Sequence, residues 1–190
     1  MNYRLRFPHG VANLTVHADA ELTTAYAATF SGPAPEVREE PGVVIIDYPK
    51  FNAFQWGRTS ADITLNPAHA WAIEVQGGIA HWTGDLHAIE LAGVEVRGGL
   101  SHVDLALPEP KGSVRIYVSG GASALNLRRP AGVGARLIVG GGASKLGLDD
   151  QFLGAVGGRV RLQTAGRSDS AGSYEIEVGG GASKLTVSAE

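Results

Sequence analysis

The sequence predicts an all-β protein, a β-solenoid whose rungs are about 21 residues long. A pair of glycines recurs in it, starting at residues 77, 98, 120, 141 and 180, so the steps are 21, 22, 21 and 39 residues. On both sides of each pair apolar residues alternate with polar ones, which is the period of a strand with one buried face. No segment has the 3.6-residue period of a helix. Because so short a unit cannot bury its own apolar face, stacked units are expected.

The copies of this motif follow one another along the chain. The regular copies span 71–82, 94–108, 114–130, 137–148 and 176–187, and fainter ones span 9–16 and 157–162. Pro108 and Pro130 close two of the copies, and because proline cannot donate to a ladder they mark corners. The glycine pair marks the other corner, where a Cβ would clash.

The alternation also assigns faces. The residues expected on one interior wall are Val94, Val96, Val114, Ile116, Val118, Leu137, Val139, Ile176 and Val178, and those expected on the other are Val103, Leu105, Leu125, Leu127, Leu146, Leu148, Leu185 and Val187. One feature fits badly. If the copies stack in chain order, Glu74 lies over Glu95 and Arg115 over Arg136, although like charges placed opposite each other destabilise a sheet. We expect the walls to shear, or these side chains to splay into solvent.

The first 70 residues are less regular. Two apolar segments, 22–30 and 43–48, are expected to be strands around a loop at 31–42 that is rich in proline and glycine. Phe51, Phe54 and Trp56 follow in a segment without alternation, and they would form either a platform for a sugar or peptide or a cover for the open end of the solenoid, which we favour. We therefore expect one domain over 1–190, with irregular rungs and a cap at 1–70 and regular repeats at 71–190.

The repeats resemble a known family. The GGASxL motifs at Gly120, Gly141 and Gly180, together with the turn at 130–133 and the segment 152–158, look like the bacterial putative-adhesin or "toastrack" β-strand-repeat proteins. The resemblance implies a single-stranded right-handed β-solenoid, often encoded near envelope or signalling domains. It implies no catalytic residue that could be carried over to this chain.

Composition narrows the function classes. The 190 residues include 27 glycines and no cysteine, which excludes disulfides, thiolate metal sites and cysteine nucleophiles. The net charge of −3 gives no bulk attraction to nucleic acid, and we expect no nucleic-acid partner. The sequence has neither the apolar core of a secretory signal nor a stretch long enough to span a membrane, so a cytoplasmic location is the default expectation.

Two histidines are candidates for metal ligands. His81 and His102 occupy the same place in successive copies, and Asp104 follows on the same outer face. Imidazole and carboxylate groups are suitable ligands for zinc or copper. Because a fourth protein ligand is missing, we favour solvated histidines on an acidic surface, and we expect neither a metal nor a cofactor.

We expect no enzyme. The same serine recurs as Ser101, Ser123, Ser144 and Ser183, and a catalytic group has no reason to repeat in every rung. The favoured function is a non-enzymatic scaffold or interaction module, associated with the envelope or with stress, that binds a protein or glycan. The alternatives are a carbohydrate-binding or carbohydrate-active β-helix and a self-associating solenoid.

The C-terminal copy suggests a mode of association. The copy 176–187 keeps the full alternation, and few residues follow it. In a stack built in chain order this rung would expose unpaired backbone groups at the end of the molecule. We therefore expect a homodimer through the C-terminal rung.

Overall fold

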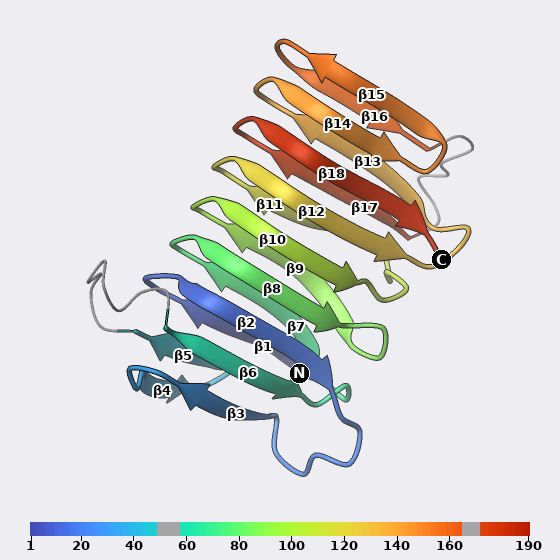
Figure 1. Cartoon of the computed structure of the whole chain (residues 1–190). Helices are drawn as coiled ribbons and strands as arrows, with labels where there is room; N and C mark the ends of the chain where they lie inside the picture. Colours follow the sequence, from blue (N-terminus) through green and yellow to red (C-terminus); the bar gives the residue numbers. More distant parts are fainter. Residues whose placement is uncertain (49–57, 165–171) are drawn as a thin grey trace.

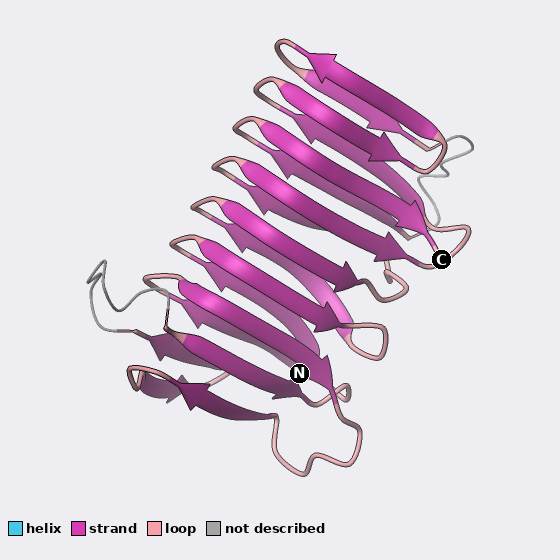
Figure 2. Cartoon of the chain, in the orientation of Figure 1, coloured by secondary structure: helices cyan, strands magenta, loops and turns pink. Residues whose placement is uncertain are grey.

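The computed structural model describes residues 1–48, 58–164 and 172–190. These residues form strands and loops and contain no helix (Figure 2). Two nine-stranded sheets lie against each other and enclose one apolar core (Figure 1). The predictions of an all-β chain and of alternating strands are confirmed.

Sheet A holds one strand from each rung, where a rung is a pair of strands at the same position in the two sheets. Its order is β16-β13-β17-β11-β9-β7-β1-β5-β4. In that order the strands are β16 (Val160–Gln163), β13 (Gly134–Val139), β17 (Ser173–Val178), β11 (Ser113–Val118), β9 (Glu90–Val96), β7 (Ala70–Val75), β1 (Asn2–Phe7), β5 (Val43–Asp47) and β4 (Glu36–Glu40).

Sheet B holds the other strand of each rung, in the order β15-β14-β18-β12-β10-β8-β2-β6-β3. In that order the strands are β15 (Gln151–Val156), β14 (Ala143–Leu148), β18 (Ala182–Ala189), β12 (Ala122–Arg129), β10 (Leu100–Ala106), β8 (Ile79–Asp85), β2 (Val11–Ala18), β6 (Ser60–Leu65) and β3 (Tyr26–Ser31).

The prediction of a single-stranded right-handed β-solenoid is wrong. The strands form two mixed sheets, which are parallel in the middle and antiparallel at both ends. The antiparallel pairs are β4 with β5, β3 with β6, β16 with β13, and β15 with β14. The rungs also do not stack in chain order, because β1 and β2 lie inside the stack, between β5 and β7 and between β6 and β8. The sequence period sets the length of a rung, whereas the pairing of edges decides the order of the rungs and the direction of each strand.

The glycine pairs form one corner of the stack. The first glycine of each pair lies against the backbone of the next rung, so a Cβ on Gly98 would be 2.5 Å from the carbonyl carbon of Gly77. Real Cβ atoms do not approach other atoms so closely, and only glycine allows the rungs to come together here. Backbone bonds then link the corners, as from the Ile79 amide to the Gly99 carbonyl at 3.1 Å.

The predicted interior walls are confirmed, because every residue assigned to them is buried. The predicted clash between Arg115 and Arg136 does not occur. Strand β17 lies between β11 and β13, which places Glu175 between the two arginines. Arg136 forms an ion pair with Glu175 at 3.1 Å, and Arg115 forms one with Glu177 at 2.8 Å.

Glu74 and Glu95 do lie opposite each other, as expected. Two arginines of β1 contact Glu74, Arg4 at 2.6 Å and Arg6 at 3.1 Å. Glu95 pairs with Arg97 at 3.0 Å. Each carboxylate therefore has its own cation, which offsets the repulsion between them.

The C-terminal rung is not an open end. Strand β17 pairs with β11 and β13, and β18 pairs with β12 and β14, so both strands are covered on both sides. The premise of docking through this rung does not hold. A homo-oligomer stays a prediction, and it would have to use another surface.

The N-terminal third is more ordered than expected. The segment 31–42, expected to be a loop, contains β4, and the strand expected at 22–30 begins only at Tyr26. Together β3 and β4 form the last rung at this end of the stack. The short charged run Glu36–Glu40 does not look like a strand from its sequence, but it satisfies the edge of β5 by antiparallel pairing.

Candidate functional site: the cleft between β3 and β4

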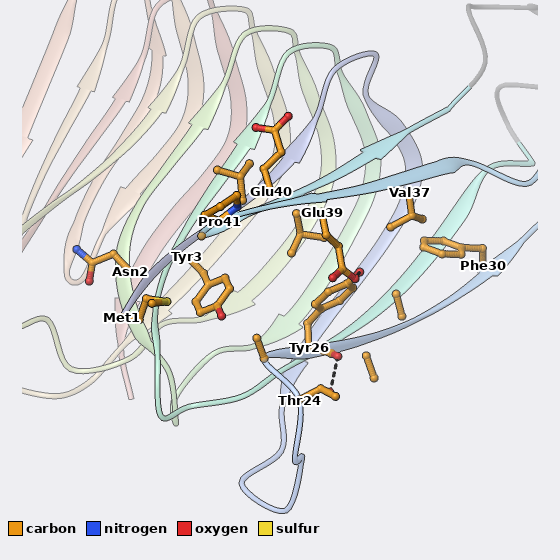
Figure 3. A pocket seen from close by; sticks show the side chains of 16 residues that line it. Met1, Asn2, Tyr3, Thr24, Tyr26, Phe30, Val37, Glu39, Glu40 and Pro41 are labelled. Carbon is orange, nitrogen blue, oxygen red and sulfur yellow. Dashed lines mark hydrogen bonds between the residues drawn. The ribbon is translucent and has the colours of Figure 1, made fainter.

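A cleft of about 910 Å³ opens at the end of the stack, between the last strands of the two sheets (Figure 3). Its walls come from β3 and β4, and β1 and β5 contribute the floor. The lining residues are Met1, Asn2, Tyr3, Thr24, Ala25, Tyr26, Ala27, Ala28, Phe30, Val37, Glu39, Glu40, Pro41, Gly42, Val43 and Val44.

The cleft exists because the inward columns of both sheets end here. On β3 the inward side chains are Tyr26, Ala28 and Phe30, which lie opposite the buried face of β6. The small Ala28 between two rings leaves space in the wall. On β4 the inward residues are Val37 and Glu39, and Val37 is 39% exposed. On the next strands of the two sheets the same columns are covered by a further rung, and their inward residues, such as Ile63 and Ile46, are buried.

A hydrogen bond spans the cleft between the two sheets. The Tyr26 hydroxyl donates to a carboxylate oxygen of Glu39 at 2.7 Å. Burial, the hydrogen bond to Glu39 and the charge of Glu39 raise the pKa of Tyr26 to about 12. Tyr26 therefore stays protonated at neutral pH and keeps donating, while the second oxygen of the carboxylate can accept from a ligand.

Aromatic contacts hold the walls in place. Phe30 packs edge-on against Tyr48 with ring centroids 6.5 Å apart, and the Tyr48 hydroxyl donates to the Ser60 carbonyl at 2.9 Å. Tyr3, on the floor, stacks on the buried Trp71 at 5.0 Å. Because these rings are fixed by neighbours outside the cleft, the site is pre-formed.

The cleft is acidic. The Glu39 side chain points into it, and Glu40 lies at its rim with the side chain directed outward (Figure 3). Among the described residues neither forms an ion pair with a lysine or arginine. The cation of β4, Arg38, lies on the outer face, where it contacts Glu36 at 3.7 Å and Asp47 at 3.4 Å. The charge that an incoming ligand meets is therefore negative.

The two histidines of the sequence prediction do come together. His81 and His102 are paired on β8 and β10, and their rings stack with centroids 5.0 Å apart and planes at 18°. Asp104 instead forms an ion pair with Arg128 at 2.9 Å. Over 1–48, 58–164 and 172–190 no group of three or more metal-ligating side chains is found. That the histidine pair binds no metal stays a prediction.

The sequence favours Phe51, Phe54 and Trp56 as a cover for the end of the stack, with a ligand platform as the alternative. Phe51, Phe54 and Trp56 fall outside the described residues. The recurring serines do form a column, since Ser123, Ser183 and Ser144 lie side by side on three neighbouring strands.

Sequence reasoning missed Tyr26 and Glu39. Both lie in the irregular N-terminal third, and the pair meets only because β3 and β4 end the two sheets at the same rung. One signal was available. The run 36–40 places a glutamate where the alternation from Val37 calls for an inward residue, and an inward charge is a device of edge strands.

The fold has a counterpart among solved structures. A putative cell adhesion protein from Clostridium sporogenes is similar to the chain, with a TM-score of 0.71, 20% identity, and coverage of 100% of this chain and 93% of that one. No protein-family model matches the sequence, and a search of curated proteins finds no match. At this identity the likeness establishes the shared fold. In the part of the chain that the structure describes, no helix is long and apolar enough to cross a membrane.

Proposed function

We propose that the chain is a non-enzymatic binding module of the adhesin kind, and that it binds its partner in the cleft between β3 and β4. The observation that carries this proposal is the cleft itself, a pre-formed hollow of about 910 Å³ whose apolar walls are partly exposed. Ligand sites are typically concave, largely apolar and supplied with a few placed polar groups. Tyr26 and Glu39 are such groups.

Two further observations support an adhesin. The putative cell adhesion protein from Clostridium sporogenes shares the fold over the whole chain. The GGASxL repeats also resemble those of the bacterial putative-adhesin repeat proteins, which favours placing the chain in that family. Fold likeness does not by itself carry function, so the cleft remains the basis of the proposal.

An array of immobilised peptides and glycans, probed with the fluorescently labelled chain, tests the proposal. Ala28→Arg fills the cleft from its β3 wall. Thr29→Arg adds the same side chain to the opposite, exposed face of the same strand and is the matched control. We expect the unaltered chain and Thr29→Arg to bind the same array members, and Ala28→Arg to lose them.

The proposal fails if Ala28→Arg, shown to be folded by its melting temperature, retains the full binding pattern. It also fails if the bound array members are chemically altered when analysed by mass spectrometry, because a binding module leaves its ligand intact.

A further inference from the structure

Strand β4 has one unpaired edge. It pairs with β5 on one side and ends sheet A, and within the described residues no strand covers its other side. All five residues of Glu36–Glu40 are exposed. Backbone N–H and C=O groups on such an edge are a template for another strand. The edge also borders the cleft, so a segment that pairs with it can place side chains inside.

The side chains of β4 define what such a segment must carry. Val37 and Glu39 face the cleft, whereas Glu36, Arg38 and Glu40 face outward. Arg38 is already engaged by Asp47 and Glu36, and Glu40 has no cation among the described residues. The wall opposite is apolar, with Phe30 and Ala28. A complementary segment is therefore both basic and apolar.

A second copy of β4 is a poor occupant of this edge. Pairing two such strands would bring the three glutamates of one run close to those of the other, and like charges opposite each other destabilise a sheet. The inward Glu39 opposes the same pairing, since inward charges prevent edge-to-edge association. The charges of β4 therefore disfavour pairing with a second β4 and favour pairing with a cationic strand.

We propose that β4 accepts an extended segment of another protein as an additional strand, and that this segment alternates apolar residues with lysine or arginine. This inference rests on the proposed function and names its ligand class. Main-chain hydrogen bonds to β4 provide affinity, as in other recognition by strand addition. Apolar side chains enter the cleft beside Val37 and Phe30, and basic side chains, which alternate with them, meet Glu36 and Glu40 on the outer face.

The test uses a seven-residue fluorescent peptide in which valine and lysine alternate, titrated with the full chain and followed by anisotropy. We expect saturable binding. The double variant Glu36→Gln/Glu40→Gln should weaken it at least about tenfold, because it removes the carboxylates that lie beside the lysines of the added strand. Glu95→Gln/Glu177→Gln removes the same charge from the outer face of the middle of sheet A and should leave binding unchanged.

Two altered peptides separate strand addition from simple charge attraction. A peptide with glutamate in place of lysine should not bind. A peptide with every second backbone amide methylated keeps its charge but cannot complete the ladder, so it should also fail. Equal binding of the methylated peptide, or equal loss in the two double variants, would overturn the proposal.

The outcomes also separate this inference from the proposed function. If the valine–lysine peptide does not bind while Ala28→Arg still abolishes binding to glycans on the array, strand addition is wrong and the cleft is a glycan site. If neither peptides nor glycans depend on Ala28, both proposals fail.

Discussion

The middle and the N-terminal end of the stack use the same alternation but differ in what covers them. Leu127, in the middle, is 1% exposed, and its strand has a partner on both sides. Val37, at the end, is 39% exposed, and its strand has a partner on one side. Inward-facing side chains thus make a core in one place and the wall of a cleft in the other.

This difference separates stability from binding. In the middle, each rung removes apolar surface from water and completes the backbone ladders of its neighbours, so that region supplies most of the folding free energy. At the end, apolar surface and backbone groups remain exposed to solvent. A ligand that covers them gains the interactions that an additional rung would have made.

Truncating one inward side chain in each region tests this division of roles and should give the largest effect on stability. Leu127→Ala should lower the free energy of unfolding by about 2–5 kcal/mol, because rungs on both sides hold the cavity open. Val37→Ala should cost less than about 1 kcal/mol, since its side chain is already partly in water. Urea denaturation measures both, and equal losses would mean that the end rung is as well packed as the middle.

The glycine corner allows a second comparison. In Gly98→Ala the new Cβ would meet the Gly77 backbone at 2.5 Å, and the shift this forces should cost about 1–3 kcal/mol. Gly112→Ala adds the same methyl group where nothing lies within 4 Å and should be neutral or slightly stabilising. Melting temperatures compare the two variants. If Gly98→Ala is as stable as Gly112→Ala, the rungs do not touch at the corner.

At the end of the stack, Tyr26 links stability to pH. Its pKa is raised to about 12, whereas an unfolded tyrosine titrates near pH 10, so the folded chain binds more protons between these values. The free energy of unfolding should therefore fall as pH rises from about 10 to 12, and Tyr26→Phe should make that fall shallower. Denaturation at a series of alkaline pH values measures the slope.

A control tyrosine lies outside the cross-cleft bond. Burial alone raises the pKa of Tyr48 to about 12. Tyr48→Phe should also reduce the slope. In the double variant Tyr48→Phe/Glu39→Gln, the changes in the free energy of unfolding caused by the two single substitutions should add. In the Tyr26→Phe background Glu39→Gln should add almost nothing, and additivity there would contradict the hydrogen bond between Tyr26 and Glu39.

The smallest expected effect concerns backbone strain after the corner. Lys145 has a φ of 54°, in the left-handed region that side chains disfavour. Lys145→Gly should leave stability unchanged or raise it by up to about 1 kcal/mol, and the exposed Lys145→Ala should be close to silent. A loss of more than about 1 kcal/mol in the glycine variant, measured by thermal denaturation, would show that the lysine side chain contributes packing.

Much of the middle could be predicted from the sequence. Alternation is a local property, so Val114, Ile116 and Leu127 could be assigned to the core without knowing which strands they pair with. Rung order is not local. It depends on which strand edges form hydrogen bonds with each other, including strands far apart in the sequence. For this reason the alternation alone predicts the C-terminal rung at the end of the stack, whereas it lies inside the stack.

The sequence did carry a hint of the true order. Stacking in chain order places Arg115 over Arg136, an unfavourable contact that the insertion of Glu175 replaces with alternating charges. Such a conflict between like charges signals that the assumed neighbours are wrong. The cleft carried a weaker signal, because Tyr26 and Glu39 come from separate strands in different sheets and no spacing in the sequence links them.

The central claim is that the middle of the stack stabilises the fold while the N-terminal end binds the ligand. Amide hydrogen exchange, measured with and without the valine–lysine peptide, tests this claim most directly. Without peptide, amides of β9 to β12 should exchange slowly, and those of β4 that point away from β5 should exchange fast. With peptide bound, protection should rise at Glu36–Glu40 and remain unchanged in the middle strands. If the bound peptide instead protects middle strands and leaves β4 unchanged, the binding site does not lie at the end of the stack.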